Sequence, residues 1–130
     1  LGRRFRALKL WTLIRSEGVG GLQRRLRRDI ANAKWLAEQV AATPNWRVVA
    51  PVPLQTVCVI HEPPGMPADV LDSFTRLWAE QVNVSGAAYL TPAHLGGRWV
   101  VRVSVAGLTT ERADVQAVWD AMRRAAESEF

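Results

Sequence analysis

The sequence contains a single cysteine, only two lysines and no long run of apolar residues. With Cys58 alone, the chain can form no internal disulfide and can offer no set of cysteine ligands to a zinc ion. Its apolar runs fall far short of the roughly 20 residues that a membrane-spanning helix requires. We therefore expect a protein of the cytoplasm, without a signal peptide and without a membrane partner.

The sequence also lacks the common catalytic motifs. It has neither GxxxxGK[ST] nor GxGxxG, and its GVGG segment follows a predicted helix rather than a strand. The two histidines lack the spacing of a metal-binding pair, and Ser85 and Ser104 lack the GxSxG context of a hydrolase nucleophile. Lys9 and Lys34 lie among ordinary surface charges, unlike a desolvated Schiff-base lysine. We therefore expect no metal site and no complete catalytic constellation.

Arginine dominates the charge of the chain. Lysine and arginine together number 17 against 12 acidic residues, which gives a net charge of +5, and six tryptophans accompany them. A basic balance suggests an anionic partner such as nucleic acid, but arginine and tryptophan are also enriched where proteins dock on one another. We favour a docking face. The alternative is a small arginine-rich α+β module that binds nucleic acid or an acidic protein.

Helical spacing is clear in the first third of the chain. Polar and apolar residues alternate with a helical period from Phe5 to Ser16, and the glycines at 18, 20 and 21 should break this helix. A longer helix should follow, with the arginines of RRLRR turned away, and end at Thr43-Pro44-Asn45. Its predicted apolar stripe comprises Leu22, Leu26, Ile30, Ala33, Ala37 and Val40.

The remaining 90 or so residues alternate between predicted strands and helices. Strands are expected at 46–50, at 56–60, which is typical of a central strand, and at 87–92 and 98–105. One helix should start near Pro67, and the last should be capped by Thr109 or Thr110. Their predicted inward residues are Val70, Leu71, Phe74, Leu77, Trp78 and Val82, and Val115, Val118, Trp119 and Met122. This order predicts an α+β fold: an antiparallel sheet of about four strands with helices on one face, preceded by N-terminal helices.

The segment RWVVRVSV contains an arginine in the middle of a predicted strand. Because side chains alternate across a sheet, Trp99 and its alternate neighbours should meet the helices, and Arg102 should lie on the face that the helices leave open. A guanidinium at mid-sheet needs an anionic partner. Two interpretations stay open: a structural ion pair with an acid of this chain or of a neighbouring domain, or a clamp for a ligand carboxylate. A third hypothesis, an independent enzyme that uses Arg102 and His94, has no paired base or nucleophile to support it.

Several segments resemble the C-terminal region of the group II pyridoxal-phosphate-dependent amino-acid decarboxylases, the family of the aromatic-L-amino-acid, histidine and glutamate decarboxylases. The most specific is LGRRFRALKLW with its continuation LIRSEGVGGLQRRLRRDIANAKWLAEQV. The others are the VCVI strand, VNVSGAAYLTP and RWVVRVSVAGLTTERADVQAVWDAM. The resemblance covers essentially the whole chain.

The resemblance implies the small C-terminal domain of a fold-type I enzyme. Residues 1–17 would form a helix that links to a large domain, and residues 18–130 would form the small domain. The large domain would bind pyridoxal 5′-phosphate and carry its lysine, and the family forms homodimers. The chain, which does not begin with methionine, would then be a piece of a longer protein, cut in an exposed loop and inactive alone.

The resemblance also implies two substrate-binding residues. Gly2 matches a position near the substrate side chain in the aromatic and histidine decarboxylases, where a glycine leaves room for an aromatic ring. Arg102 matches the strand arginine that resembles a substrate-carboxylate ligand in glutamate decarboxylase. The expected partners are the large domain, a second subunit and an amino-acid substrate, with no nucleic acid and no membrane.

Overall fold

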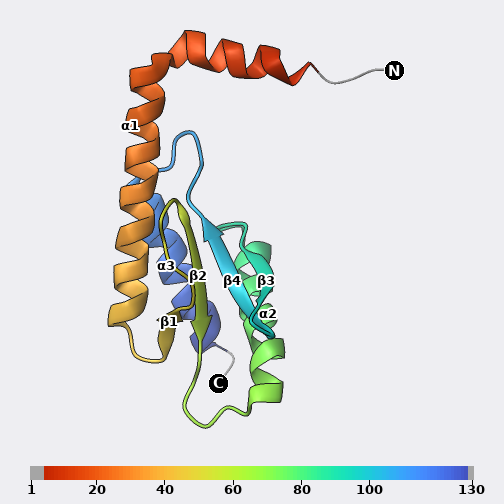
Figure 1. Ribbon diagram of the computed structural model, residues 1–130. Coiled ribbons are helices and arrows are strands. Elements are labelled where there is room, and N and C mark those ends of the chain that lie inside the picture. The colour runs from red at the N-terminus through yellow and green to blue at the C-terminus, as the bar shows by residue number, and fades with distance from the viewer. Residues whose placement is uncertain (1–4, 129–130) are drawn as a thin grey trace.

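A four-stranded antiparallel sheet lies at the centre of the computed structural model, which describes residues 5–128 (Figure 1). The spatial order is β1-β2-β4-β3, so β2 and β4 are the inner strands. Thr56 of β2 lies opposite Ser104 of β4. The strands are β1 (Trp46–Val48), β2 (Thr56–His61), β3 (Thr91–Leu95) and β4 (Arg98–Ser104).

Three helices complete the fold: α1 (Arg6–Ala42), α2 (Ala68–Val84) and α3 (Arg112–Glu127). In Figure 1, α2 and α3 lie behind the sheet, and α1 runs beside β1. Helix α1 contacts β1 and β2, α2 contacts β3 and β4, and α3 contacts both other helices. The predicted α+β architecture is confirmed.

The core lies between the helices and one face of the sheet. Trp46 is its aromatic centre, because its ring meets Trp78 edge-on at 5.4 Å and Trp119 at 4.9 Å. Alternate residues of the inner strands complete the sheet side of the core: Val57, Val59, Val101, Val103 and Val105. The alternation predicted for residues 98–105 is therefore confirmed, since Arg102 and Ser104 are exposed on the opposite face.

Some predicted details are wrong for local reasons. Residues 87–90 are not a strand, because the side chain of Asn83 binds both the backbone N–H and the carbonyl of Leu90 and holds this segment against α2. Helix α3 is capped by Glu111 in a capping box with Asp114, not by a threonine. Three predicted core residues are exposed: Leu26, Val70 and Leu77.

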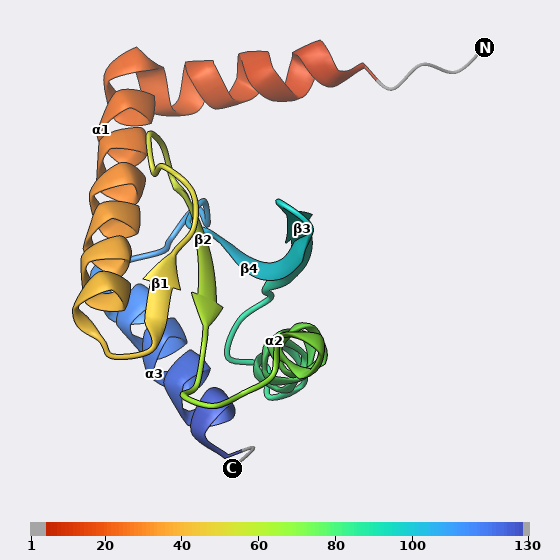
Figure 2. The same cartoon turned by 60° about the horizontal axis from the view of Figure 1, so that its bottom comes forward.

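Helix α1 breaks at Gly18, as the glycines predict. Gly18 has φ 68° and ψ 165°, a backbone conformation open essentially only to glycine, and helical geometry resumes after it. We call residues 6–17 the arm; Figure 2 shows it bending sharply away from the rest of α1 and standing clear of the sheet. An ion pair crosses the break, since Arg25 Nη1 lies 2.9 Å from Glu17 Oε1.

Replacing Gly18 with alanine should straighten α1. No atom lies within 4 Å of the added Cβ, so the substitution causes no steric clash. An alanine in this backbone conformation costs about 1–3 kcal/mol of strain. The chain avoids that strain if residue 18 becomes helical and α1 becomes continuous. Small-angle scattering should show a longer particle, with more helical circular dichroism. Gly20→Ala is the matched control, because Gly20 is already helical, and it should leave the particle length unchanged.

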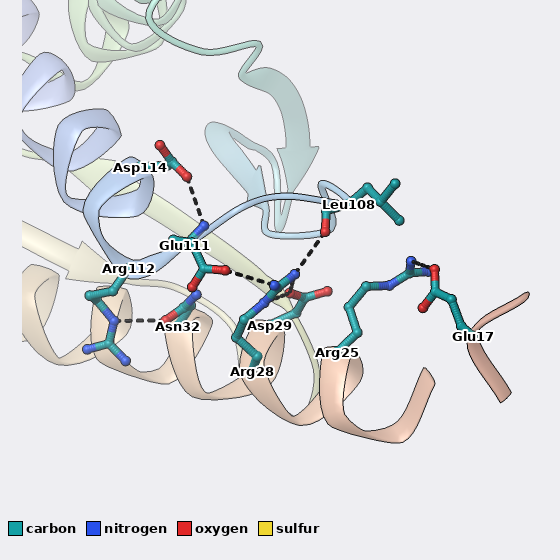
Figure 3. A network of polar contacts seen from close by, with 9 residues as sticks. All are labelled: Glu17, Arg25, Arg28, Asp29, Asn32, Leu108, Glu111, Arg112 and Asp114. Carbon is teal, nitrogen blue, oxygen red and sulfur yellow. Dashed lines mark hydrogen bonds and ion pairs between the residues drawn. The ribbon is translucent and has the colours of Figure 1, made fainter. Parts of the chain in front are cut away.

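A polar network joins α1 to the start of α3 (Figure 3). Arg28 donates to Glu111 at 3.0 Å and to the carbonyl of Leu108 at 3.2 Å. Arg112 donates to Asn32 Oδ1 at 2.8 Å. Asn32 is buried, as is the adjacent Asp29, so this side of α1 is polar where the sequence predicts only an apolar stripe.

Candidate functional site

The open face of the sheet carries one arginine without a partner among residues 5–128. Arg102 is exposed at the middle of β4, and its side chain takes part in none of the ion pairs or side-chain hydrogen bonds between described residues. Its neighbours in register are Cys58 on β2 and Thr91 on β3. No acidic side chain belongs to these flanking positions, so the guanidinium can accept an anion from outside.

Small polar side chains extend this patch along the inner strands. The hydroxyl oxygens of Thr56 and Ser104 lie 3.4 Å apart on the same face, one pleat beyond Cys58 and Arg102. Hydroxyl groups donate and accept hydrogen bonds, and they add no charge of their own. Arg102 therefore lies in a neutral polar patch, which suits two-point binding of a carboxylate.

A second cluster on the same face is fully paired. Arg47 donates to Glu62 Oε2 from Nε at 3.0 Å and from Nη2 at 2.9 Å, and Arg98 Nη1 donates to Glu62 Oε1 at 3.2 Å. This cluster was not among the predicted sites. The only available signal was the position of Glu62, two residues after Ile60, which places both side chains on one face of the strand.

The other predicted residues are placed differently. Gly2 lies outside the described residues. His94 packs edge-on against Trp99 at 5.5 Å, and because Trp99 is an odd-numbered residue of β4 it lies on the face opposite Arg102. The structure therefore does not bring His94 and Arg102 together. An ion pair between Arg102 and an acid of this chain is absent among residues 5–128.

His61 is a buried histidine that stacks on Trp46 with ring centroids 4.6 Å apart. Its Nδ1 has no hydrogen-bond partner among the described atoms. Burial lowers the pKa of His61 below the ordinary value of 6.5, and the negative charge of Glu127 opposes this in part. The fold therefore favours the neutral ring.

The stability of the chain should fall in mild acid because of His61. In the unfolded chain His61 binds a proton near pH 6.5, whereas in the folded chain it does so only at lower pH. The stabilisation that comes from the neutral ring is therefore complete above pH 6.5 and is lost as the pH falls through the folded pKa. The slope should stay below about 1.4 kcal/mol per pH unit, the value for one full proton. Urea unfolding between pH 7 and pH 5 measures it. His61→Phe should flatten that slope, and an unchanged slope would assign it to other groups.

The arm presents an exposed apolar surface. Trp11 is 60% exposed, and three more large apolar residues of the arm are also exposed: Leu8, Leu10 and Ile14. Phe5, directly before the arm, is 73% exposed. By contrast, Trp35 is half-buried beneath the guanidinium of Arg112, 4.8 Å from its ring. An apolar patch beside arginines is typical of a surface that docks on protein.

The arginines of RRLRR do not form a free basic stripe. Arg25 pairs with Glu17 and Arg28 pairs with Glu111, so two of the four are held by acids of the chain. A nucleic-acid interface needs a continuous unpaired basic surface. The geometry gives the nucleic-acid alternative no specific support.

Residues 5–128 contain no group of three or more His, Cys, Asp or Glu side chains that could hold a metal ion. None of the helices in this range combines the length and the apolar character that crossing a bilayer requires.

Comparison with known proteins shows what the chain is similar to. The model of the pyridoxal-dependent decarboxylase conserved domain matches residues 1–61. Tyrosine decarboxylase 1 of Narcissus pseudonarcissus is 35% identical over 129 residues, and tryptophan decarboxylase TDC2 of Camptotheca acuminata is 36% identical over 129 residues. These matches cover 95% and 98% of this chain but 25% and 26% of the relatives. The chain is thus similar along nearly its whole length to pyridoxal-dependent decarboxylases.

A solved structure agrees with this similarity. The chain superposes on the structure of Oryza sativa TDC with PLP and tryptamine with a TM-score of 0.88 and 31% identity. This match covers 98% of the present chain and 28% of the other. The chain therefore spans about a quarter of the length of the relatives that it matches.

The described residues do not fit the cofactor of the family. A pyridoxal phosphate site needs a lysine for the Schiff base together with a partner for the pyridine nitrogen. Lys34 is exposed on α1, and Lys9 is exposed on the arm, in a groove otherwise lined by Leu8, Thr12, Leu13 and Ser16. No carboxylate lines that groove. The described residues alone therefore support no chemistry of the cofactor.

Proposed function

We propose that the chain is the C-terminal part of a longer pyridoxal-phosphate-dependent carboxy-lyase that acts on an aromatic L-amino acid. The observation that carries this proposal is the similarity along nearly the whole chain to tyrosine and tryptophan decarboxylases. The cofactor supplies the electron sink for loss of carbon dioxide when it is bound. A large domain outside this chain holds it.

Within this proposal, residues 18–130 form the small domain and residues 1–17 link it to the large domain. The exposed apolar arm supports this division, because Gly18 separates it from the body and its side chains lack a covering surface within residues 5–128. The arm docks on the large domain or on the second subunit of a homodimer. The assembled enzyme is cytoplasmic.

Arg102 binds a substrate carboxylate in the assembled enzyme. It is exposed, mid-sheet and unpaired among the described residues, and a guanidinium binds a carboxylate through two parallel hydrogen bonds. Gly2, by the family resemblance, lies near the substrate side chain. This chain thus contributes recognition, and the remainder of the protein contributes the chemistry.

The test is an assay of the longer protein. A protein that carries this chain together with its upstream region is supplied with pyridoxal phosphate, and carbon dioxide release is measured from a panel of aromatic and acidic L-amino acids. Release is expected with an aromatic substrate, and none from the 130-residue chain alone. Absence of release across the panel, or release by the short chain, would contradict the proposal.

A further inference from the structure

Within residues 5–128, the open face of the sheet holds three arginines, and one of them, Arg102, has no ion-pair partner. Arg47, Arg98 and Arg102 all lie on this face, as their register shows: Arg47 lies opposite Ile60, and Arg98 and Arg102 share one side of β4. Glu62 is the acidic residue that pairs with two of these arginines. Its position decides which guanidinium is left unpaired.

Glu62 divides its two oxygens between two arginines. Oε2 receives both hydrogen bonds from Arg47 and Oε1 receives the one from Arg98, and the Glu62 side chain is 32% exposed. Both oxygens of Glu62 are therefore engaged by these two arginines. Ile60, which lies opposite Arg47 in register, is buried, and so is Val100 of β4.

Arg102 is out of reach of this carboxylate. It is four residues along β4 from Arg98, about 13 Å at the usual rise of a strand. Its neighbours in register, Cys58 and Thr91, are uncharged. An anion that approaches the face therefore meets two arginines already bound to a tethered carboxylate and one that is not.

We infer that Glu62 is a positioning residue for anion recognition: by holding Arg47 and Arg98, it confines carboxylate binding on this face to Arg102. A tethered carboxylate competes as if at millimolar or higher concentration, so a free carboxylate does not displace it readily. The inference rests on the proposed role of Arg102. It makes Glu62 the residue that gives the face one carboxylate site instead of several.

The experiment is an acetate titration of the 130-residue chain, followed by the Nε–Hε nuclear magnetic resonance signals of its arginines at constant ionic strength. In the wild type, the Arg102 signal should move about three- to five-fold further than those of Arg47 and Arg98, in keeping with the modest strength of exposed ion pairs. In Glu62→Gln, the signals of Arg47 and Arg98 should respond as strongly as that of Arg102.

Glu17→Gln is the matched control. It removes a carboxylate from Arg25, away from the sheet, and should leave the responses of Arg47 and Arg98 at the wild-type level. Backbone amide spectra check that each variant is folded. A purely structural role for Glu62 would alter the mobility of both arginines without giving them acetate binding.

Three results would overturn the inference: equal responses of all three arginines in the wild type, no response of Arg102, or no gain by Arg47 and Arg98 in Glu62→Gln. None of these results bears on the decarboxylase proposal, which the carbon dioxide assay of the longer protein tests separately. Conversely, a failed carbon dioxide assay with the expected titration would keep the anion site and refute the proposed enzyme.

Discussion

Replacing Trp78 with alanine is expected to lower the free energy of unfolding by about 3–5 kcal/mol, enough to unfold much of the chain at 37 °C. Trp78 is fully buried and packs edge-on against Trp46. Its removal leaves a cavity where α2, the sheet and α3 meet. The indole N–H has no hydrogen-bond partner among the described atoms. The substitution therefore removes no hydrogen bond, and the expected loss of stability comes from packing.

Urea unfolding followed by circular dichroism measures this effect. Trp11→Ala is the control, because it makes the same chemical change on the exposed arm and should shift the unfolding free energy by less than about 0.5 kcal/mol. A similar loss in both variants would mean that the arm packs against the body in solution.

Replacing Arg102 with glutamine should lower kcat/KM of the longer enzyme by about 10- to 100-fold, the usual range for loss of a charge-assisted hydrogen bond. Because Arg102 is exposed and unpaired among residues 5–128, the melting temperature should hardly change. Steady-state carbon dioxide release and thermal unfolding measure the two effects on the same preparation.

Arg98→Gln is the control for this substitution. Arg98 lies on the same strand and face, but its charge is already held by Glu62, so activity should fall by less than about three-fold. Equal losses of kcat/KM in the two variants would show that the total positive charge of this face, and not Arg102 in particular, attracts the substrate. Retained activity in Arg102→Gln would remove this arginine from substrate binding.

Features governed by local chemistry could be predicted from the sequence. Three close glycines predicted the break at Gly18, and strict alternation in residues 98–105 predicted that Arg102 lies on the open face. Both predictions depend on properties of a few adjacent residues. The resemblance to decarboxylases, carried by the first segment, agrees with the relatives to which the chain is similar.

Features that depend on distant pairing could not be predicted. Glu62 meets Arg47 and Arg98 only because β1 and β4 flank β2, and the sequence alone does not fix that order. Asn83 fixes Leu90 through its amide, so the strand predicted at 87–92 starts later, at Thr91. The buried Asp29 and Asn32 look like surface residues until α3 is placed beside them.

The contacts of Arg28 and Arg112 tie the first helix of the body to the last helix of the chain. Fraying from the C-terminal side must therefore disrupt residues that lie some 80 positions earlier in the chain. We expect amide hydrogens in the second half of α1 and in α3 to exchange at a common rate, as one cooperative unit. Because the first and last helices of the body stabilise one another, partial proteolysis should begin in the middle segments of the chain or in the arm.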